Sequence, residues 1–236
     1  MARLAAGRTT QLSATEIATE LLRLFDESGT EPSIRALASA LHVSPRAIYH
    51  YYETREQLVA ATLDLVWDEA IADVLESVAD PLARLDDPVE FFVLSGVATR
   101  RAFGRHRRLA MHLGIPSGPT SRLSGGMAIL GAAFEQLGLS GEQAGLAMYT
   151  YATYVLGSIM LDASRSIELE ADDPRAASRS TTNRDLLPDD APAVSDATFA
   201  AIDQVVSGGR RDPDVAEELF ADGLRAVLTG FVHPVH

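Results

Sequence analysis

Apolar side chains recur at helical spacing along almost the whole chain, and no segment alternates apolar and polar residues over the length of a strand. The first helix shows the pattern, since Ile17, Leu21 and Phe25 fall on one face. Just before them, Ser13 and Glu16 have the spacing of a capping box, which marks a helix N-terminus. The sequence therefore predicts an all-α fold.

Glycine, proline and polar clusters divide the chain into a series of helices. A helix starting at Ser44 has Pro45 at its first position, where the missing N–H costs no hydrogen bond. The region 164–194, rich in Asp, Pro, Ser, Thr and Arg, is predicted as a flexible loop. The predicted helices span residues 13–27, 33–41, 44–51, 54–78, 89–104, 106–113, 120–137, 140–164, 195–207 and 214–229.

The charge is unevenly distributed. The net charge is −13, yet residues 1–60 carry six arginines against seven acidic residues. The acidity lies almost wholly in the rest of the chain, and an acidic body can orient a DNA-binding protein through its one neutral end. All 20 basic residues are arginine, a bias that we attribute to the composition of the source genome.

Several classes of chemistry have no support in the sequence. The absence of cysteine excludes disulfides, thiolate metal sites and cysteine nucleophiles. Phosphate-binding loops, zinc-protease motifs and nucleophile elbows are also missing. We therefore expect no enzymatic activity, no cofactor and no metal. The N-terminal residues lack the apolar core of a signal peptide, and no uninterrupted apolar run approaches membrane-spanning length, so we expect a cytoplasmic protein without membrane contact.

Three short helices followed by a long one form a unit of the size of a helix-turn-helix module. In such a module one helix enters the major groove, which admits a single α-helix with its side chains. The entering helix needs apolar residues inside and small or polar residues outside. In the third helix and its preceding turn, Val43, Ala47 and Ile48 can face inward, and Ser44, Arg46, Tyr49 and His50 can face outward.

The stretches Val43–Tyr52 and Thr54–Leu58 resemble the signature of the TetR family of repressors, and the similarity is dense over residues 13–63. A weaker similarity to the C-terminal domain of the tetracycline-repressor type continues at Leu156-Gly157, His112-Leu113-Gly114 and residues 219–224. The resemblance implies a helix-turn-helix DNA-binding domain over residues 1–60. It implies an effector-binding and dimerisation domain over residues 61–236.

The resemblance also implies roles for individual residues. Arg35 matches a position that reaches guanine or phosphate, and Arg46 and His50 match base-reading positions. Ala47 stands where the family commonly has threonine, and its methyl group could meet a thymine methyl. The expected DNA-binding residues are Ser33, Arg35, Ser44, Arg46, Ala47, Tyr49, His50, Tyr51 and Arg55, of which Tyr49, Tyr51 and Arg55 would contact phosphates.

Some of these residues have other interpretations. Arg35 could pair with Glu31 on the surface, and Tyr49 or Tyr52 could belong to the core. The basic run from Arg100 to Arg108 is expected to be a solvated face, with a role at a hinge as the alternative.

Apolar residues with scattered polar groups in the C-terminal part are candidates for a ligand cavity, although each could instead be core. His112 matches a tetracycline-repressor position that binds a ligand-held magnesium. However, Leu161 replaces the assisting carboxylate and Ile115 the following threonine. We therefore expect a bulky, partly apolar effector without an obligatory metal. The candidate effector-binding residues are Ser95, Thr99, Phe103, His112, Met127, Leu130, Phe134, Tyr151, Tyr154 and Met160.

The segments 140–163 and 214–230 match the family's dimerisation helices, which implies a two-fold homodimer. The predicted function is a ligand-responsive repressor that binds a palindromic operator as a dimer and is released by a small effector. One alternative is an all-helical small-molecule-binding protein or enzyme without a DNA-binding role. Another is an activator or a nucleoid-associated protein with little sequence preference.

Overall fold

The computed structural model describes residues 12–28, 30–77, 87–113, 121–139, 141–170, 195–202 and 212–232. These ranges contain helices and no strand, as the apolar spacing predicts. The helices are α1 (Ala14–Glu27), α2 (Ile34–Ala40), α3 (Pro45–Tyr49), α4 (Arg55–Ser77), α5 (Pro88–Arg105), α6 (Arg107–Ala110), α7 (Ser121–Gln136), α8 (Gly141–Glu170) and α11 (Pro213–Val232). A further short helix covers 196–202.

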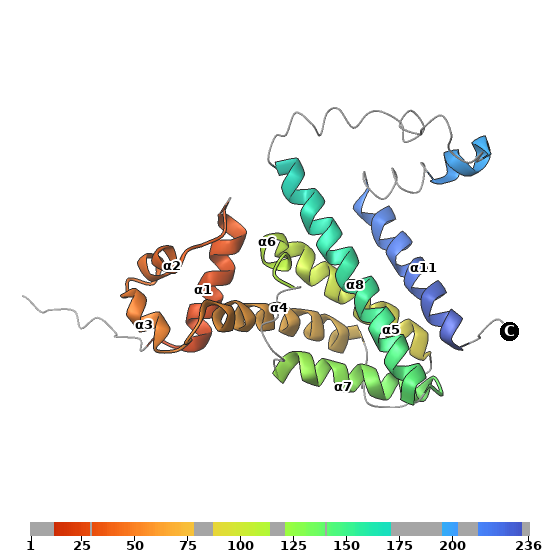
Figure 1. Cartoon of the computed structure of the whole chain (residues 1–236), viewed down its shortest axis with the longest axis horizontal. Helices are drawn as coiled ribbons and strands as arrows, with labels where there is room; N and C mark the ends of the chain where they lie inside the picture. The colour runs from red at the N-terminus through yellow and green to blue at the C-terminus, as the bar shows by residue number, and fades with distance from the viewer. Residues whose placement is uncertain are drawn as a thin grey trace, which may run out of the picture.

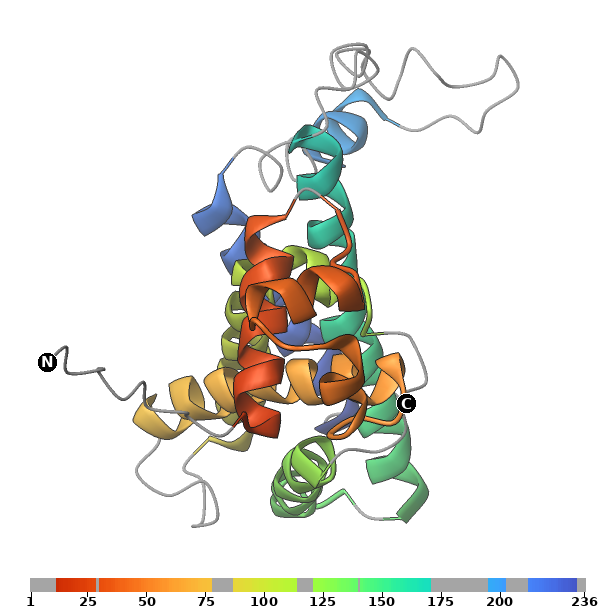
Figure 2. The same ribbon diagram turned by 90° about the vertical axis from the view of Figure 1, so that its left-hand side faces the viewer.

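The first three helices and the start of α4 form a small unit at one end of the molecule (Figures 1 and 2). The predicted capping box opens α1, because Ser13 accepts a hydrogen bond from the Glu16 N–H and the Glu16 carboxylate accepts one from the Ser13 N–H. Leu37 of α2 and Ile48 of α3 are fully buried in the hydrophobic core. This core fixes the angle between the two short helices.

The turn between α2 and α3 contains His42 with a φ of 55°. A left-handed backbone is uncommon for a residue other than glycine, and histidine is among the side chains that tolerate it best. The Val43 N–H then donates to the carbonyl of Ala38, which closes the end of α2. The sharp turn places α3 directly after α2 with its outer side exposed.

Helix α4 begins in this unit and runs into the body of the molecule (Figure 1). Its first turns pack on α1, and its later turns pack on α5 and α7. The division of domains predicted between residues 60 and 61 therefore falls inside a continuous helix. That division stays a prediction, and the two predicted parts share α4 as a common element.

Helix α5 is the centre of the body and packs on α4, α7, α8 and α11. Its buried Phe92 contacts Phe134 of α7 and Tyr151 of α8, with ring centroids 4.0 Å and 5.4 Å away. On the α11 side, a Cβ on Gly96 would lie only 2.7 Å from a Leu224 methyl carbon. The absence of a side chain at Gly96 therefore permits the close approach of α5 and α11, which a larger residue at this position would prevent.

Helix α8 is longer than predicted. The sequence places a flexible loop over residues 164–194, but residues 164–170 continue the helix, so the prediction is wrong there. Ile159 and Ala163 are buried, and Asp162 pairs with Arg100 of α5. These contacts with the body continue beyond the apolar central part of α8 and stabilise its later turns. Residues 171–194 lie outside the described ranges.

Candidate functional site

Helix α3 is short, and its start is defined by two side chains. The Ser44 hydroxyl accepts a hydrogen bond from the Ala47 N–H at 3.3 Å, and Pro45 occupies the first turn. In the same way, the hydroxyl of Ser33 caps α2 by accepting from the Ala36 N–H at 3.1 Å. Both predicted DNA-binding serines thus cap helices, and their hydroxyl hydrogens are not used in these bonds.

The outer side of α3 carries Arg46, Tyr49 and His50, all of them exposed. None of the three side chains forms a hydrogen bond or ion pair with another described residue; the His50 ring only lies edge-on to Tyr51, with ring centroids 5.6 Å apart. Ala47 is half-buried. We define Arg46, Tyr49 and His50 as the α3 outer face. The alternative that places Tyr49 in the core is wrong, since 45% of it is exposed.

Arg35 of α2 is also exposed. The alternative that pairs it with Glu31 is wrong, because the carboxylate of Glu31 binds the guanidinium of Arg55 at 2.5 Å. Arg55 also donates to the carbonyl of Pro32 at 2.8 Å. Arg35 therefore keeps its cationic group at the surface, while Arg55 ties the start of α4 to the segment before α2.

Two tyrosines after α3 hold the start of α1. The hydroxyl of Tyr51 donates to the carbonyl of Leu12, and that of Tyr52 donates to the carbonyl of Ala14 at 2.8 Å. Burial raises the pKa of Tyr52. The core interpretation of Tyr52 is thus supported. Tyr51 is 37% exposed, but its hydroxyl hydrogen is already used inside the protein.

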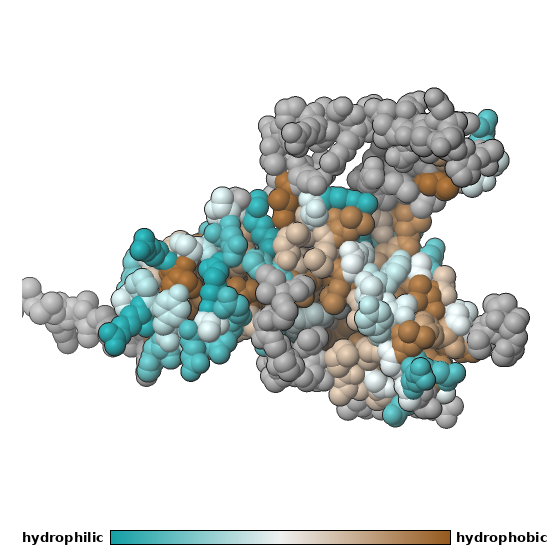
Figure 3. All heavy atoms as spheres, viewed as in Figure 1, coloured by the Kyte–Doolittle hydropathy of each residue, from teal (hydrophilic) through white to brown (hydrophobic). Residues whose placement is uncertain are grey.

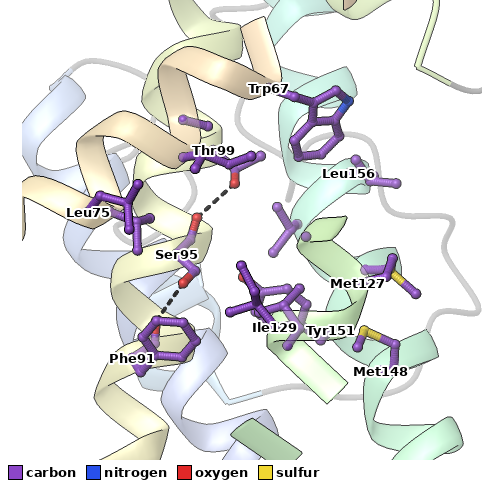
Figure 4. Close-up of a pocket in the computed structure, with 17 residues that line it drawn as sticks. Trp67, Leu75, Phe91, Ser95, Thr99, Met127, Ile129, Met148, Tyr151 and Leu156 are labelled. Carbon is purple, nitrogen blue, oxygen red and sulfur yellow. Dashed lines mark hydrogen bonds between the residues drawn. The ribbon is translucent and has the colours of Figure 1, made fainter. Parts of the chain in front are cut away.

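A pocket lies in the body between α4, α5, α7 and α8, and Figure 4 shows its side chains. The space free of atoms between these helices measures about 930 Å³, with the open solvent at its mouth included. The lining residues that the structure describes are Trp67, Ala70, Ile71, Val74, Leu75, Phe91, Ser95, Thr99, Gly126, Met127, Ile129, Leu130, Met148, Tyr151, Ala152, Val155 and Leu156. We refer to this site as the α4–α8 pocket.

Five of the ten candidate effector-binding residues line the α4–α8 pocket: Ser95, Thr99, Met127, Leu130 and Tyr151. The structure brings them together because α5, α7 and α8 present their partly buried faces to one another. Burial raises the pKa of the Tyr151 hydroxyl, which stays neutral at physiological pH. The sequence thus predicted some, but not all, of the pocket-lining residues on these three helices.

The other candidates lie elsewhere. Phe103 packs edge-on against Trp67, with centroids 5.0 Å apart, and Phe134 is fully buried against Phe92, so both are core residues. Tyr154 turns toward α11, where its hydroxyl donates to a backbone carbonyl at 3.3 Å. Met160 is half-buried on α8 and is not part of the lining. Helical spacing predicts that these residues lie on apolar faces. Because each helix packs on several neighbours, the spacing does not tell whether a face meets the pocket or another helix.

His112 is also absent from the described pocket lining. It lies in the turn after α6, edge-on to Phe25 of α1 at 5.4 Å, with Nε2 3.9 Å from the Glu31 carboxylate. The turn faces the N-terminal unit because α6 packs on α1 as well as on α8. His112 therefore contributes to the junction between that unit and the body.

We expect His112 to make stability depend on pH. Burial lowers its pKa and outweighs Glu31, which favours protonation. The unfolded chain then takes up a proton below about pH 6.5 while the folded chain stays neutral, so stability is lost as pH falls through that value. Urea unfolding near pH 7.5 and pH 5.5 measures this loss. In His112→Phe it should be smaller, and an equal loss in both proteins would contradict the assignment.

Helix α4 contributes to the pocket, although no residue of this helix was predicted to do so. Trp67, Ile71, Val74 and Leu75 come from this helix. Leu63 and Val66, by contrast, belong to its buried core side. The signal in the sequence was the presence of apolar residues on more than one face of α4, which indicates a helix covered on two sides.

The predicted solvated face Arg100–Arg108 is largely paired with carboxylates instead. Arg100 binds Asp162 at 2.7 Å, and Arg105 binds Glu69 of α4 at 2.8 Å. Between α5 and α6, the imidazole of His106 contacts Asp26 of α1 at 2.9 Å and Glu69 at 3.3 Å. The contacts of Arg105 and His106 thus connect the body to α1 and α4.

Comparison with known proteins adds independent information. Residues 17–62 match the sequence profile of the bacterial regulatory proteins of the tetR family. This range covers most of α1, all of α2 and α3, and the first turns of α4, and it includes the exposed α3. A comparison with curated protein sequences found no match.

Solved structures match almost the whole chain. The TetR family protein ActR from Streptomyces coelicolor, in complex with actinorhodin, has a TM-score of 0.71 at 20% identity, covering 94% of this chain and 96% of its own. SCO7222, a TetR from the same organism, has a TM-score of 0.66 at 26% identity, with coverages of 94% and 98%. BioQ with its double-stranded DNA operator has a TM-score of 0.54 at 24% identity, with coverages of 69% and 97%.

Proposed function

We propose that this chain is a dimeric transcriptional repressor of the tetR family of bacterial regulatory proteins, which a small molecule releases from its operator. The observation that carries the proposal is the α3 outer face, whose Arg46, Tyr49 and His50 are exposed in a unit that matches the family profile. As a DNA-binding regulator without enzymatic activity, the protein would act in the cytoplasm.

The α3 outer face has the chemistry of a base-reading surface. An arginine can donate two hydrogen bonds to guanine, and tyrosine and histidine can contact bases or phosphates. Arg35 lies on the preceding helix and would add a phosphate or base contact. We assign Tyr51 and Arg55 a second role as supports of this face, because their internal bonds fix the helices on either side. The structure of BioQ with its operator supports the use of this fold on DNA.

The α4–α8 pocket is the proposed effector site. Its apolar walls suit a partly apolar molecule, and ActR, which has the same fold, is described in complex with actinorhodin. Trp67 and Ile71 of α4 line this pocket, and the first turns of the same helix pack on α1. A ligand in the pocket would therefore contact the helix that carries the DNA-binding unit.

The exposed side of helix α8 supports the proposal of a dimer. Leu146, Tyr149 and Leu161 are exposed by 56%, 71% and 50%, and Thr153 and Gly157 lie exposed between them on the same side. We call these five residues the α8 outer stripe. The segment Gly141–Ile167 of α8, which carries this stripe, is long and apolar enough to cross a membrane by length and composition alone, with a mean hydropathy of 1.2, and only 22% of its apolar window is buried. A second copy of α8 and α11 would cover this surface in a two-fold dimer.

Figure 3 shows the contrast between the two ends of the molecule. Hydrophilic side chains dominate the end with α2 and α3, and apolar surface gathers on the body. This division suits a molecule that binds nucleic acid at one end and associates with another protein chain through the other. The dimer would place two α3 helices about one DNA turn apart, on the two halves of a palindromic site.

The proposed mechanism is a shift between two positions of the DNA-binding units. The ligand would favour the position in which α4 opens the pocket, and it shifts the equilibrium only by its difference in affinity for the two states. The contacts of His106 with Asp26 and Glu69 lie where α1 and α4 meet the body. They would move with α4 and change the spacing of the two α3 helices.

Gel-shift titration of the protein on the DNA upstream of its own gene tests the proposed function. We expect a palindromic site bound with a Kd in the nanomolar range, about 10⁻⁸–10⁻¹¹ M, with a strong decrease as salt rises. A footprint would show protection of two half-sites. The absence of a palindromic site with salt-sensitive binding would contradict the repressor assignment.

A further inference from the structure

We infer that the α4–α8 pocket takes an uncharged, mostly apolar ligand and recognises on it a hydroxyl or N–H group that donates a hydrogen bond to the side chains of Ser95 and Thr99. The inference rests on the proposed function, in which this pocket is the effector site. It goes further by naming the charge of the ligand and the one polar group that the protein reads.

The first argument concerns charge. The described lining contains no Asp, Glu, Lys, Arg or His, and its walls are almost entirely apolar carbon and methionine sulfur. A carboxylate or an ammonium group entering this space would lose water without gaining a partner of opposite charge. The pocket therefore favours neutral molecules over their charged analogues.

The second argument concerns hydrogen-bond donors. The hydroxyl of Ser95 donates to the carbonyl of Phe91 at 2.8 Å, and that of Thr99 donates to the carbonyl of Ser95 at 2.7 Å, as Figure 4 shows. The Tyr151 hydroxyl donates to the carbonyl of Phe92 at 3.2 Å. A hydroxyl has one hydrogen and two lone pairs, so the three oxygens retain only the capacity to accept.

The positions of the polar groups orient the ligand. Ser95 and Thr99 are one turn apart on α5, so their oxygens form a short accepting strip on one wall. In Figure 4, Met127 and Met148 lie on the other side of the view, and Trp67 lies toward the top. Trp67 carries the one side-chain N–H of the described lining. A ligand would direct its donor toward α5 and its apolar body toward the methionines.

Three matched probes test the inference on the full chain: 4-phenylphenol, 4-methoxybiphenyl and biphenyl-4-carboxylate. Trp67 is the single tryptophan of the chain and lines the pocket, so changes in its fluorescence report binding there. Calorimetry gives the affinities. We expect the phenol to bind about fivefold more tightly than the ether, the effect of one hydrogen bond, and the carboxylate to bind at least about tenfold more weakly than the ether.

Two variants separate the accepting strip from general packing. In Ser95→Ala/Thr99→Val both oxygens are removed, and the ratio of phenol to ether affinity should fall to about one. Thr62→Val is the matched control, because Thr62 is buried on α4 and donates to the Leu58 carbonyl at 2.8 Å outside the described lining. Its ratio should stay at about fivefold.

The inference is overturned if the carboxylate binds as tightly as the phenol, if the double variant keeps the phenol preference, or if none of the probes binds. The titrations contain no DNA, so they are independent of operator binding. A protein that shows these preferences without binding an operator would support the inference while the proposed function fails. A protein that binds an operator but lacks the preferences would overturn the inference alone.

Discussion

Replacing Arg46 by alanine is expected to weaken operator binding by about 30-fold or more. The side chain lies on the α3 outer face without a hydrogen bond or ion pair to the rest of the described chain, so the fold should not depend on it. A bidentate contact of arginine with guanine contributes about 1–3 kcal/mol, and a two-fold dimer would lose it twice. Fluorescence anisotropy titrations on operator DNA at fixed salt measure the change.

Arg101→Ala provides a control with the same change of net charge. Arg101 lies on α5 in the body, its side chain is exposed and its ion pair with Glu217 lies at the surface, so its loss should affect stability little. Operator affinity should stay within about twofold of the unmodified protein. If Arg101→Ala and Arg46→Ala weaken binding equally, Arg46 acts through overall charge and the assigned reading face is wrong.

Replacing Tyr149 by arginine is expected to convert the proposed dimer to a monomer. Operator affinity should then fall by roughly 100-fold or more, because each DNA-binding unit binds alone. Tyr149 is the most exposed large apolar side chain in the described ranges and belongs to the α8 outer stripe. An arginine there would bring two like charges into an apolar interface without partners. Analytical ultracentrifugation gives the oligomeric state of the variant.

Tyr149→Phe is the matched control, since it keeps the ring and removes only the hydroxyl. This variant should remain dimeric and bind the operator normally. Circular dichroism should show that both variants keep the helical content of the unmodified protein. A Tyr149→Arg protein that remains dimeric would show that α8 is not the dimer surface, and would leave the operator prediction for Arg46 intact.

The helices of the N-terminal unit could be predicted in detail because their signals are local. Ser13 and Glu16 are three residues apart, and Ser44 and Pro45 are adjacent, so helix starts are visible in the sequence. The internal bonds of Tyr51 and Arg55 could not be predicted in the same way. Their partners lie 39 and 24 residues away in the chain, and only packing brings them together.

The pocket was predictable in part for a related reason. Helical periodicity identifies the apolar faces of α5, α7 and α8, but it does not state which neighbour each face meets. Phe134 and Met127 are both on α7, yet one is buried against Phe92 and the other lines the pocket. His112 fits a ligand-binding turn by resemblance, whereas the packing of α6 on α1 turns it toward Phe25.

The sequence by itself determined most of the helices, the caps of the first ones and the exposed outer side of α3, because each depends on residues within a few positions of one another. Tertiary structure decided where the pocket opens, and that Trp67 and Ile71 of α4 line it. It also decided that His106 joins α1 and α4 to the body. These features depend on how helices distant in the chain pack, and a local pattern records only that a face is apolar, not what covers it.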